Sequence, residues 1–294
     1  MITNPNILVV DDNAKILHNV EHMLETENYN VLTATNGLDA LDILEKTEIS
    51  IDLIICDIMM PKMDGYTLYK SISDDPLFFD IPFIFISEWS TPDDIRFAKL
   101  LGVDDYITKP FDESYFLAII RGKLLRREKK LLLTKKVEEK LLPLKIDDED
   151  ISKSEKEEAL CIVLLMHWDE LKGPKLIRKY TEYEDLPYAI DEISLQIFQT
   201  IVSIFSDVNK IDIQGFLMNL EKINLYCYVY FDTIPNLESE KNELYMMCAI
   251  APKINYLESL RIEEEFNKCL NEIKRRIELD LKQVYNSIIS FLKF

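Results

Sequence analysis

The sequence predicts an α/β domain with a five-stranded doubly wound parallel sheet, followed by an α+β domain with an antiparallel sheet. The chain has 294 residues, enough for two domains, and 48% of them are hydrophobic, enough to build two cores. In the first ~120 residues, short apolar runs alternate with helical patterns, as is typical of parallel sheets. In the last ~135 residues, strands follow one another directly, which indicates antiparallel pairing.

Five strand–helix pairs are predicted in the first domain. The strands are expected at 7–10, 30–34, 53–57, 82–87 and 105–108. The helices are expected over 14–27, from Gly37, from Gly65, from a Thr91 cap to Gly102, and from an Asp112 cap.

Polar side chains stand at the carboxyl ends of four of these strands. Asp11 and Asp12 follow the first strand, Asp57 ends the third, Ser87 ends the fourth and Lys109 follows the fifth. Each could singly be a helix cap, a turn residue or a surface residue. Because the carboxyl ends of parallel strands meet at one edge, where ligands bind, we expect them to converge on one site.

The motifs at this edge resemble those of the receiver domains of two-component response regulators, which have a flavodoxin-like fold. "VVDD" (9–12), "CDIMMPKMDG" (56–65), Ser87 and "YITKPF" (106–111) occur in the family's order. The resemblance implies that a sensor histidine kinase or a phosphotransfer protein phosphorylates Asp57.

The resemblance also implies roles for other residues. It implies Mg²⁺ as the cofactor, coordinated by Asp12, Asp57 and the Met59 carbonyl, with Asp11 assisting through water. It implies phosphoryl binding and switching by Ser87, Lys109 and Tyr106. Pro61, Gly65 and Pro110 would shape the loops, with a cis peptide bond before Pro110.

The chemistry of these residue types agrees with that assignment. Clustered carboxylates raise one another's pKa, and a hard dication with oxygen ligands relieves their repulsion. Asp57 would then act as a nucleophile on phosphorus, while Lys109 neutralises charge on the transferring oxygens. One departure stands out, because Glu88 follows Ser87 where receiver domains usually carry a small residue. This side chain either crowds the site or points to solvent.

A long helix is predicted beyond the first domain, from Asp112 to Pro143. Between residues 121 and 145 it carries ten basic and three acidic residues, a balance of 10 − 3 = +7. A basic helix can bind nucleic acid or membranes, but a solvated connector explains it as well. We therefore predict a first domain over 1–122, a connector over 112–146, an acidic hinge over 147–158 and an output domain over 159–294.

The output domain is predicted to have the order ββαβββα. Strands are expected at 159–169, 174–180, 211–220, 224–233 and 242–251, and helices at 188–206 and 255–294, the second broken in two. This order resembles the longin, roadblock or profilin-like platforms found around small GTPases. That resemblance implies binding of a protein and transfers no functional residue.

Three functions remain open for the output domain. A protein-interaction module is favoured, with a small GTPase or a second copy of the chain as partner. A PAS-like sensory domain is an alternative, and a transcription regulator is a further one, although no helix-turn-helix signature is present. We expect no enzyme, since no Ser-His-Asp set or phosphate-binding loop is apparent.

The amino-acid composition narrows the range of possible partners and the cellular compartment. The net charge of −19 disfavours nucleic acid and anionic membranes as partners. No apolar run is long enough to span a bilayer, and no signal peptide is recognisable. The five cysteines lie far apart, as core residues of a reduced, cytoplasmic protein would.

Overall fold

The computed structural model describes residues 4–73, 75, 77–141, 160–169, 171–183, 190–205, 215–220, 223–235 and 242–292. The chain forms two compact units. The first comprises Met1–Lys129 with Asn255–Leu257, and the second comprises Lys130–Ile254 with Glu258–Phe294. The predicted acidic hinge, 147–158, lies outside the described residues.

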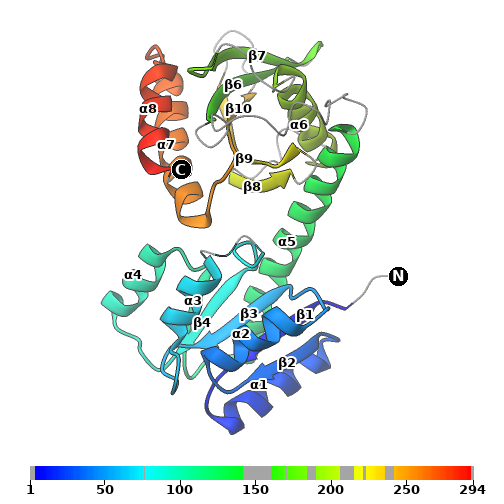
Figure 1. The fold of residues 1–294 in the computed structure, drawn as a ribbon, viewed down its shortest axis with the longest axis vertical. Helices are drawn as coiled ribbons and strands as arrows, with labels where there is room; N and C mark the ends of the chain where they lie inside the picture. Colours follow the sequence, from blue (N-terminus) through cyan, green and yellow to red (C-terminus); the bar gives the residue numbers. More distant parts are fainter. Residues whose placement is uncertain are drawn as a thin grey trace. The chain divides into compact units, whose positions relative to one another are not determined.

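The first unit is the predicted doubly wound α/β sheet (Figure 1). Its strands are β1 (Asn6–Val10), β2 (Asn30–Ala34), β3 (Leu53–Asp57), β4 (Phe83–Ser87) and β5 (Asp105–Thr108). Its helices are α1 (Ala14–Thr26), α2 (Gly37–Lys46), α3 (Gly65–Ser73), α4 (Pro92–Leu101) and α5 (Glu113–Leu141). The strands pair in parallel in the order β2-β1-β3-β4-β5.

Successive side chains along each strand point to opposite faces of this sheet, and both faces are apolar. On β1, Leu8 and Val10 face the core shared with α2, α3 and α4, whereas Ile7 and Val9 face the core shared with α1 and α5. The predicted caps form: Thr91 accepts the Asp94 N–H, and Gly102 ends α4 in the left-handed region at φ 91°. The strand ends are thereby held at one edge of a sheet covered on both faces.

The second unit is an antiparallel sheet with helices, as predicted. Its strands are β6 (Ile162–Asp169), β7 (Gly173–Tyr180), β8 (Gly215–Leu220), β9 (Leu225–Pro235) and β10 (Asn242–Ala251). Its helices are α6 (Ile190–Phe205), α7 (Tyr256–Lys274) and α8 (Leu281–Phe291). The strand order is β7-β6-β10-β9-β8. The last helical segment is broken in two, and Asp280 caps α8 by accepting the Lys282 N–H.

Helices cover both faces of this second sheet. Leu133 and Val137, near the end of α5, share a core with α6 and one sheet face. On the other face, the Tyr228 ring lies against Phe266 of α7 and the Tyr180 ring against Tyr285 of α8. All five cysteines are free and buried, as the sequence predicted. Within the described part of the chain, no helix is long and apolar enough to cross a membrane.

Candidate functional site

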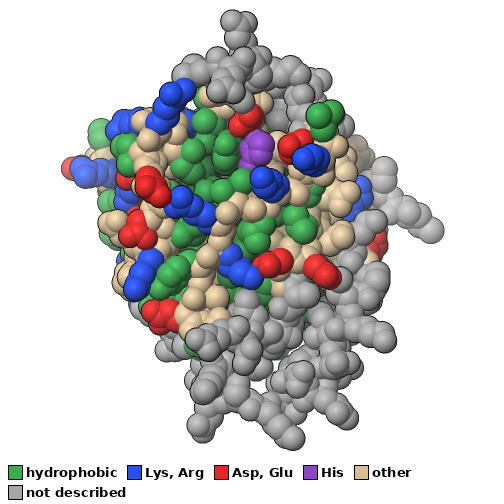
Figure 2. All heavy atoms as spheres, turned by 90° about the horizontal axis from the view of Figure 1, so that it is seen from above, with side chains coloured by type: hydrophobic (Ala, Val, Ile, Leu, Met, Phe, Trp, Pro, Cys, Tyr) green, Lys and Arg blue, Asp and Glu red, His purple; other side chains and the backbone are tan. Residues whose placement is uncertain are grey.

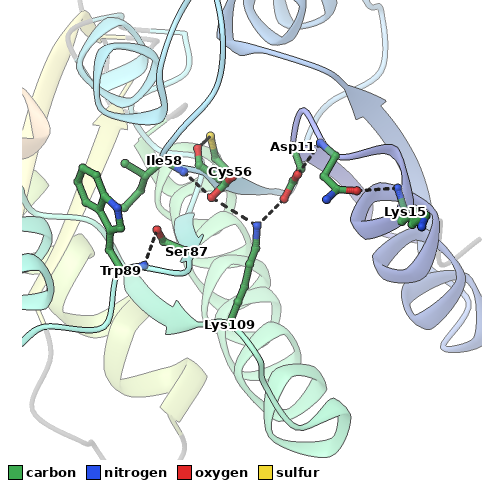
Figure 3. Close-up of polar contacts among 9 residues, drawn as sticks. Asp11, Lys15, Cys56, Ile58, Ser87, Trp89 and Lys109 are labelled. Carbon is green, nitrogen blue, oxygen red and sulfur yellow. Dashed lines mark hydrogen bonds and ion pairs between the residues drawn. The ribbon is translucent and has the colours of Figure 1, made fainter.

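A hollow of about 240 Å³ opens at the carboxyl edge of the parallel sheet. Its walls include six of the predicted site residues, namely Asp11, Asp12, Asp57, Met59, Ser87 and Lys109. These residues come from β3, β4 and the segments after β1, β3 and β5, so the strand order brings them together. Figure 3 shows the Lys109 side chain pointing between the carboxylates of β3 and of the β1 end.

An ammonium group bridges two of the carboxylates. Lys109 Nζ lies 2.6 Å from Asp11 Oδ2 and 3.4 Å from Asp57 Oδ1. Asp11 is fully buried, and its other oxygen accepts the N–H of Asn13 at 2.8 Å. Burying a carboxylate is costly without such partners, so Lys109 holds Asp11 in place as well as facing Asp57.

The Asp57 carboxyl is partly desolvated, with a side-chain exposure of 13%. Burial raises its pKa above the ordinary value of 3.8, Lys109 opposes that rise, and repulsion from Asp11 adds to it. The Ile58 N–H donates to Asp57 Oδ1 at 2.9 Å and favours the charged form. Asp57 Oδ1 thus has both a cation and a donor, while Oδ2 accepts no hydrogen bond from the described residues.

This raised pKa predicts a pH-dependent gain of stability in Asp57→Asn. The folded state binds the Asp57 proton more tightly than the unfolded chain. Protonation of Asp57 therefore adds to the free energy of unfolding. This added stability is fully present below the pKa of the unfolded chain and is lost as the pH rises through the pKa of the folded protein. We expect Asp57→Asn to be more stable than wild type at about pH 7, with a gain that shrinks towards about pH 4. The free energy of unfolding in urea measures this gain. Asp42→Asn, at an exposed position on α2, is the control and should show no such gain. If Asp57→Asn is less stable than wild type at neutral pH, the pKa of Asp57 is not raised in the folded protein.

The acidic residues fit a divalent cation. Asp11, Asp12 and Asp57 each offer an oxygen, and these oxygens lie within 4.8 Å of one another. An all-oxygen donor set of this kind suits a hard ion such as Mg²⁺. Met59 lines the same hollow, and this residue is 57% exposed.

The two predicted switch residues hold the same backbone segment. Ser87 is 1% exposed, and its Oγ accepts the Trp89 N–H at 3.2 Å. Tyr106 is also buried, and its hydroxyl donates to the Trp89 carbonyl at 2.8 Å. A movement of Ser87 would therefore change its hydrogen bond to the Trp89 backbone, which the Tyr106 hydroxyl also contacts. The role of Trp89 could not be predicted from its residue type, because both contacts are to its backbone.

The three predicted loop residues shape the surroundings. The Gly65 N–H donates to the Ile58 carbonyl at 2.9 Å, and the Pro61 carbonyl accepts the N–H of Met63 at 2.7 Å. The peptide bond between Lys109 and Pro110 is cis, as the resemblance implied.

Glu88 stands at the rim of the hollow. Its side chain is exposed, yet it lines the same hollow as Asp57 and Lys109. It also lines a neighbouring groove of about 500 Å³ beside α1, together with Ile16 and Phe111. Glu88 thus both reaches solvent and borders the site.

Comparison with known proteins agrees with this geometry. The family model for the response regulator receiver domain matches residues 7–121. Residues 7–121 form a receiver domain. Receiver domains interact with histidine kinases or phosphotransfer proteins and bind Mg²⁺ at an acidic pocket.

Relatives and solved structures match the chain over a similar extent. The response regulator SaeR of Staphylococcus aureus (strain USA300) is 36% identical over 124 residues, 42% of this chain and 52% of that protein. The chain therefore spans about half the length of the curated relatives it matches. A receiver domain from Methanospirillum hungatei JF-1 is 29% identical, with 43% of this chain and 98% of that one covered and a TM-score of 0.40. A histidine kinase receiver domain from Syntrophus aciditrophicus is 33% identical, with 41% and 89% covered and a TM-score of 0.38.

Proposed function

We propose that this chain is a two-component response regulator in which phosphorylation of Asp57 switches a protein-interaction surface on the second unit. The observation that carries the proposal is the arrangement of Asp57, with Oδ1 held by Ile58 and Lys109 and Oδ2 open to the acidic hollow. The donor is a sensor histidine kinase or a phosphotransfer protein.

Each residue of the hollow has its own role in phosphoryl transfer. Asp57 Oδ2 attacks phosphorus, and the bond from phosphorus to the donor nitrogen breaks with its electron pair on that nitrogen. Lys109 Nζ then binds an oxygen of the new aspartyl phosphate. Asp11, Asp12, Asp57 and the Met59 carbonyl would hold Mg²⁺, and the ion would supply positive charge to the transferring oxygens.

Transmission begins at the switch residues. The phosphoryl group adds about −1.5 to −2 charges, and Ser87 and Lys109 are placed to hydrogen-bond it. When Ser87 turns towards the phosphate, its bond to the Trp89 N–H is lost and the Tyr106 hydroxyl must find a new position. The face formed by α4, β5 and α5 changes with it. Both states pre-exist, and phosphorylation shifts their populations.

Labelling tests the proposed acceptor. With Mg²⁺ and a small phosphodonor, mass spectrometry of the intact protein should show one added phosphoryl group, and peptide mapping should place it on Asp57. Asp57→Asn and Asp12→Ala should abolish it, because one lacks the nucleophile and the other a metal ligand. Asp42→Asn, an exposed site on α2, should be labelled like wild type. Stable label on Asp57→Asn would refute Asp57 as the acceptor.

For the second unit, we propose a longin- or roadblock-like platform without catalytic activity. Its sheet ends in two edge strands, β7 and β8, and half of the residues of β7 are exposed. Such edges can accept a strand from another chain. Figure 2 shows a face on which basic and acidic side chains are interspersed, which favours a protein over nucleic acid as partner of that face. The leading candidates are a small GTPase and a second copy of this chain.

A further inference from the structure

The acidic hollow has a net negative formal charge, although the proposed reaction brings an anionic phosphoryl group into it. Asp11, Asp12, Asp57 and Glu88 bring four negative charges and Lys109 one positive charge, a formal sum of −4 + 1 = −3. Lys109 is already shared between Asp11 and Asp57. Of the four carboxylates, those of Asp12 and Glu88 belong to exposed residues and meet an incoming molecule first.

Glu88 differs from Asp12 in what it borders. Asp12 belongs to the trio of oxygens that fits a cation, whereas Glu88 lies outside that trio. A metal held by that trio would therefore not have the Glu88 carboxylate as a ligand. Glu88 also borders the groove beside α1, so it stands between the acceptor and the surface next to it.

We propose that Glu88 selects the phosphoryl donor by charge. It disfavours donors with an anionic leaving group and favours those whose leaving group, or the side chain beside it, is cationic. In an in-line transfer, the leaving group lies on the side of phosphorus opposite the attacking Asp57 oxygen, towards the mouth of the hollow. The matching protein donor carries a Lys or Arg beside its phosphohistidine. This inference rests on Asp57 being the acceptor.

Two small donors isolate the effect. Acetyl phosphate transfers its phosphoryl group to Asp57 as the phosphorus–oxygen bond breaks and acetate leaves with the electron pair. Zwitterionic phosphoramidate transfers the same group as its phosphorus–nitrogen bond breaks and neutral ammonia leaves with the pair. The phosphoryl group is identical, so a change in the ratio of the two rates between wild type and a Glu88 variant reports on the interaction of Glu88 with the leaving group.

The experiment measures kcat/KM for both donors at saturating Mg²⁺ with wild type, Glu88→Gln, Glu88→Asp and Glu88→Lys. We expect Glu88→Gln to raise kcat/KM for acetyl phosphate by about three- to tenfold and that for phosphoramidate by less than about twofold. Glu88→Lys should extend the trend, and Glu88→Asp should keep the wild-type ratio. High salt should reduce the difference, because exposed charges are screened.

Glu25→Gln provides the matched control, since it removes an exposed carboxylate on α1 that lines neither hollow. It should leave the donor ratio unchanged. If Glu88→Gln accelerates both donors equally, the side chain acts by bulk and the charge proposal is wrong. An unchanged ratio in every variant overturns it too. Absence of label on wild-type Asp57 with both donors would instead refute the proposed acceptor, and this inference with it.

Discussion

Gly65→Ala is expected to destabilise the receiver domain by about 3–5 kcal/mol. A Cβ atom at this position would lie 2.3 Å from the Asp57 carbonyl oxygen and 3.0 Å from Ile58 Cα. Both atoms are backbone, so no side chain can rotate to make room. Relief would require a shift of the loop that carries Asp57, the proposed acceptor. The same substitution should therefore reduce phosphorylation of the fraction that still folds.

Urea unfolding of the receiver domain, followed by Trp89 fluorescence in a Trp168→Phe background, measures this effect. The matched control is Gly122→Ala on α5, where an added Cβ meets no atom within 4 Å. That control should gain about 0.5–1 kcal/mol, since alanine has the higher helix propensity. Equal stability of Gly65→Ala and wild type would show that the close approach of α3 to the acceptor loop is not required.

Lys274→Met is expected to destabilise the second unit by about 3–5 kcal/mol. Lys274, the last residue of α7, forms an ion pair with Asp232 of β9, which is only 3% exposed. Asp232 also accepts the Thr233 N–H at 2.7 Å, which cannot by itself balance a buried charge. Removing the ammonium therefore leaves a buried carboxylate without a counter-ion.

A double-mutant cycle separates that cost from lost packing. Asp232→Asn with Lys274→Met removes the charge together with its partner, so the pair should cost less than Lys274→Met alone. Trp168 fluorescence in a Trp89→Phe background follows unfolding of the second unit. If the double variant is as unstable as the single one, the loss comes from packing of the α7 end, and the ion pair does not anchor the helix.

Much of the receiver site was predictable because its determinants are local. Asp11, Asp57 and Ser87 each end or directly follow an apolar run, and parallel pairing brings the ends of those strands to one edge. The local sequence pattern did not show that Asp11 is buried against Lys109 whereas the neighbouring Asp12 is exposed. That difference depends on a contact between residues 98 positions apart.

Other features were beyond the sequence for the same reason. The sequence pattern around Arg127 indicates a surface residue of a basic helix, yet its guanidinium donates to the backbone carbonyls of Asp80 and Ile51. Strand order in the second unit depends on pairings such as β6 with β10, which no local pattern encodes. The predicted β4 began at Pro82, whereas the strand begins at Phe83. Proline has no N–H for the ladder, which places it at or before a strand start.

The most direct test of the central claim is sedimentation velocity of the full-length chain, alone and with candidate small GTPases, before and after phosphorylation. The proteins are wild type, Asp57→Asn, Ser87→Ala and Tyr106→Ala. Phosphodonor with Mg²⁺ should change the self-association or partner binding of wild type. It should leave Asp57→Asn unchanged and have a reduced effect on Ser87→Ala and Tyr106→Ala. An identical sedimentation profile for phosphorylated and unphosphorylated wild type would contradict the central claim, and retention of a small molecule by the second unit would then indicate a sensory domain.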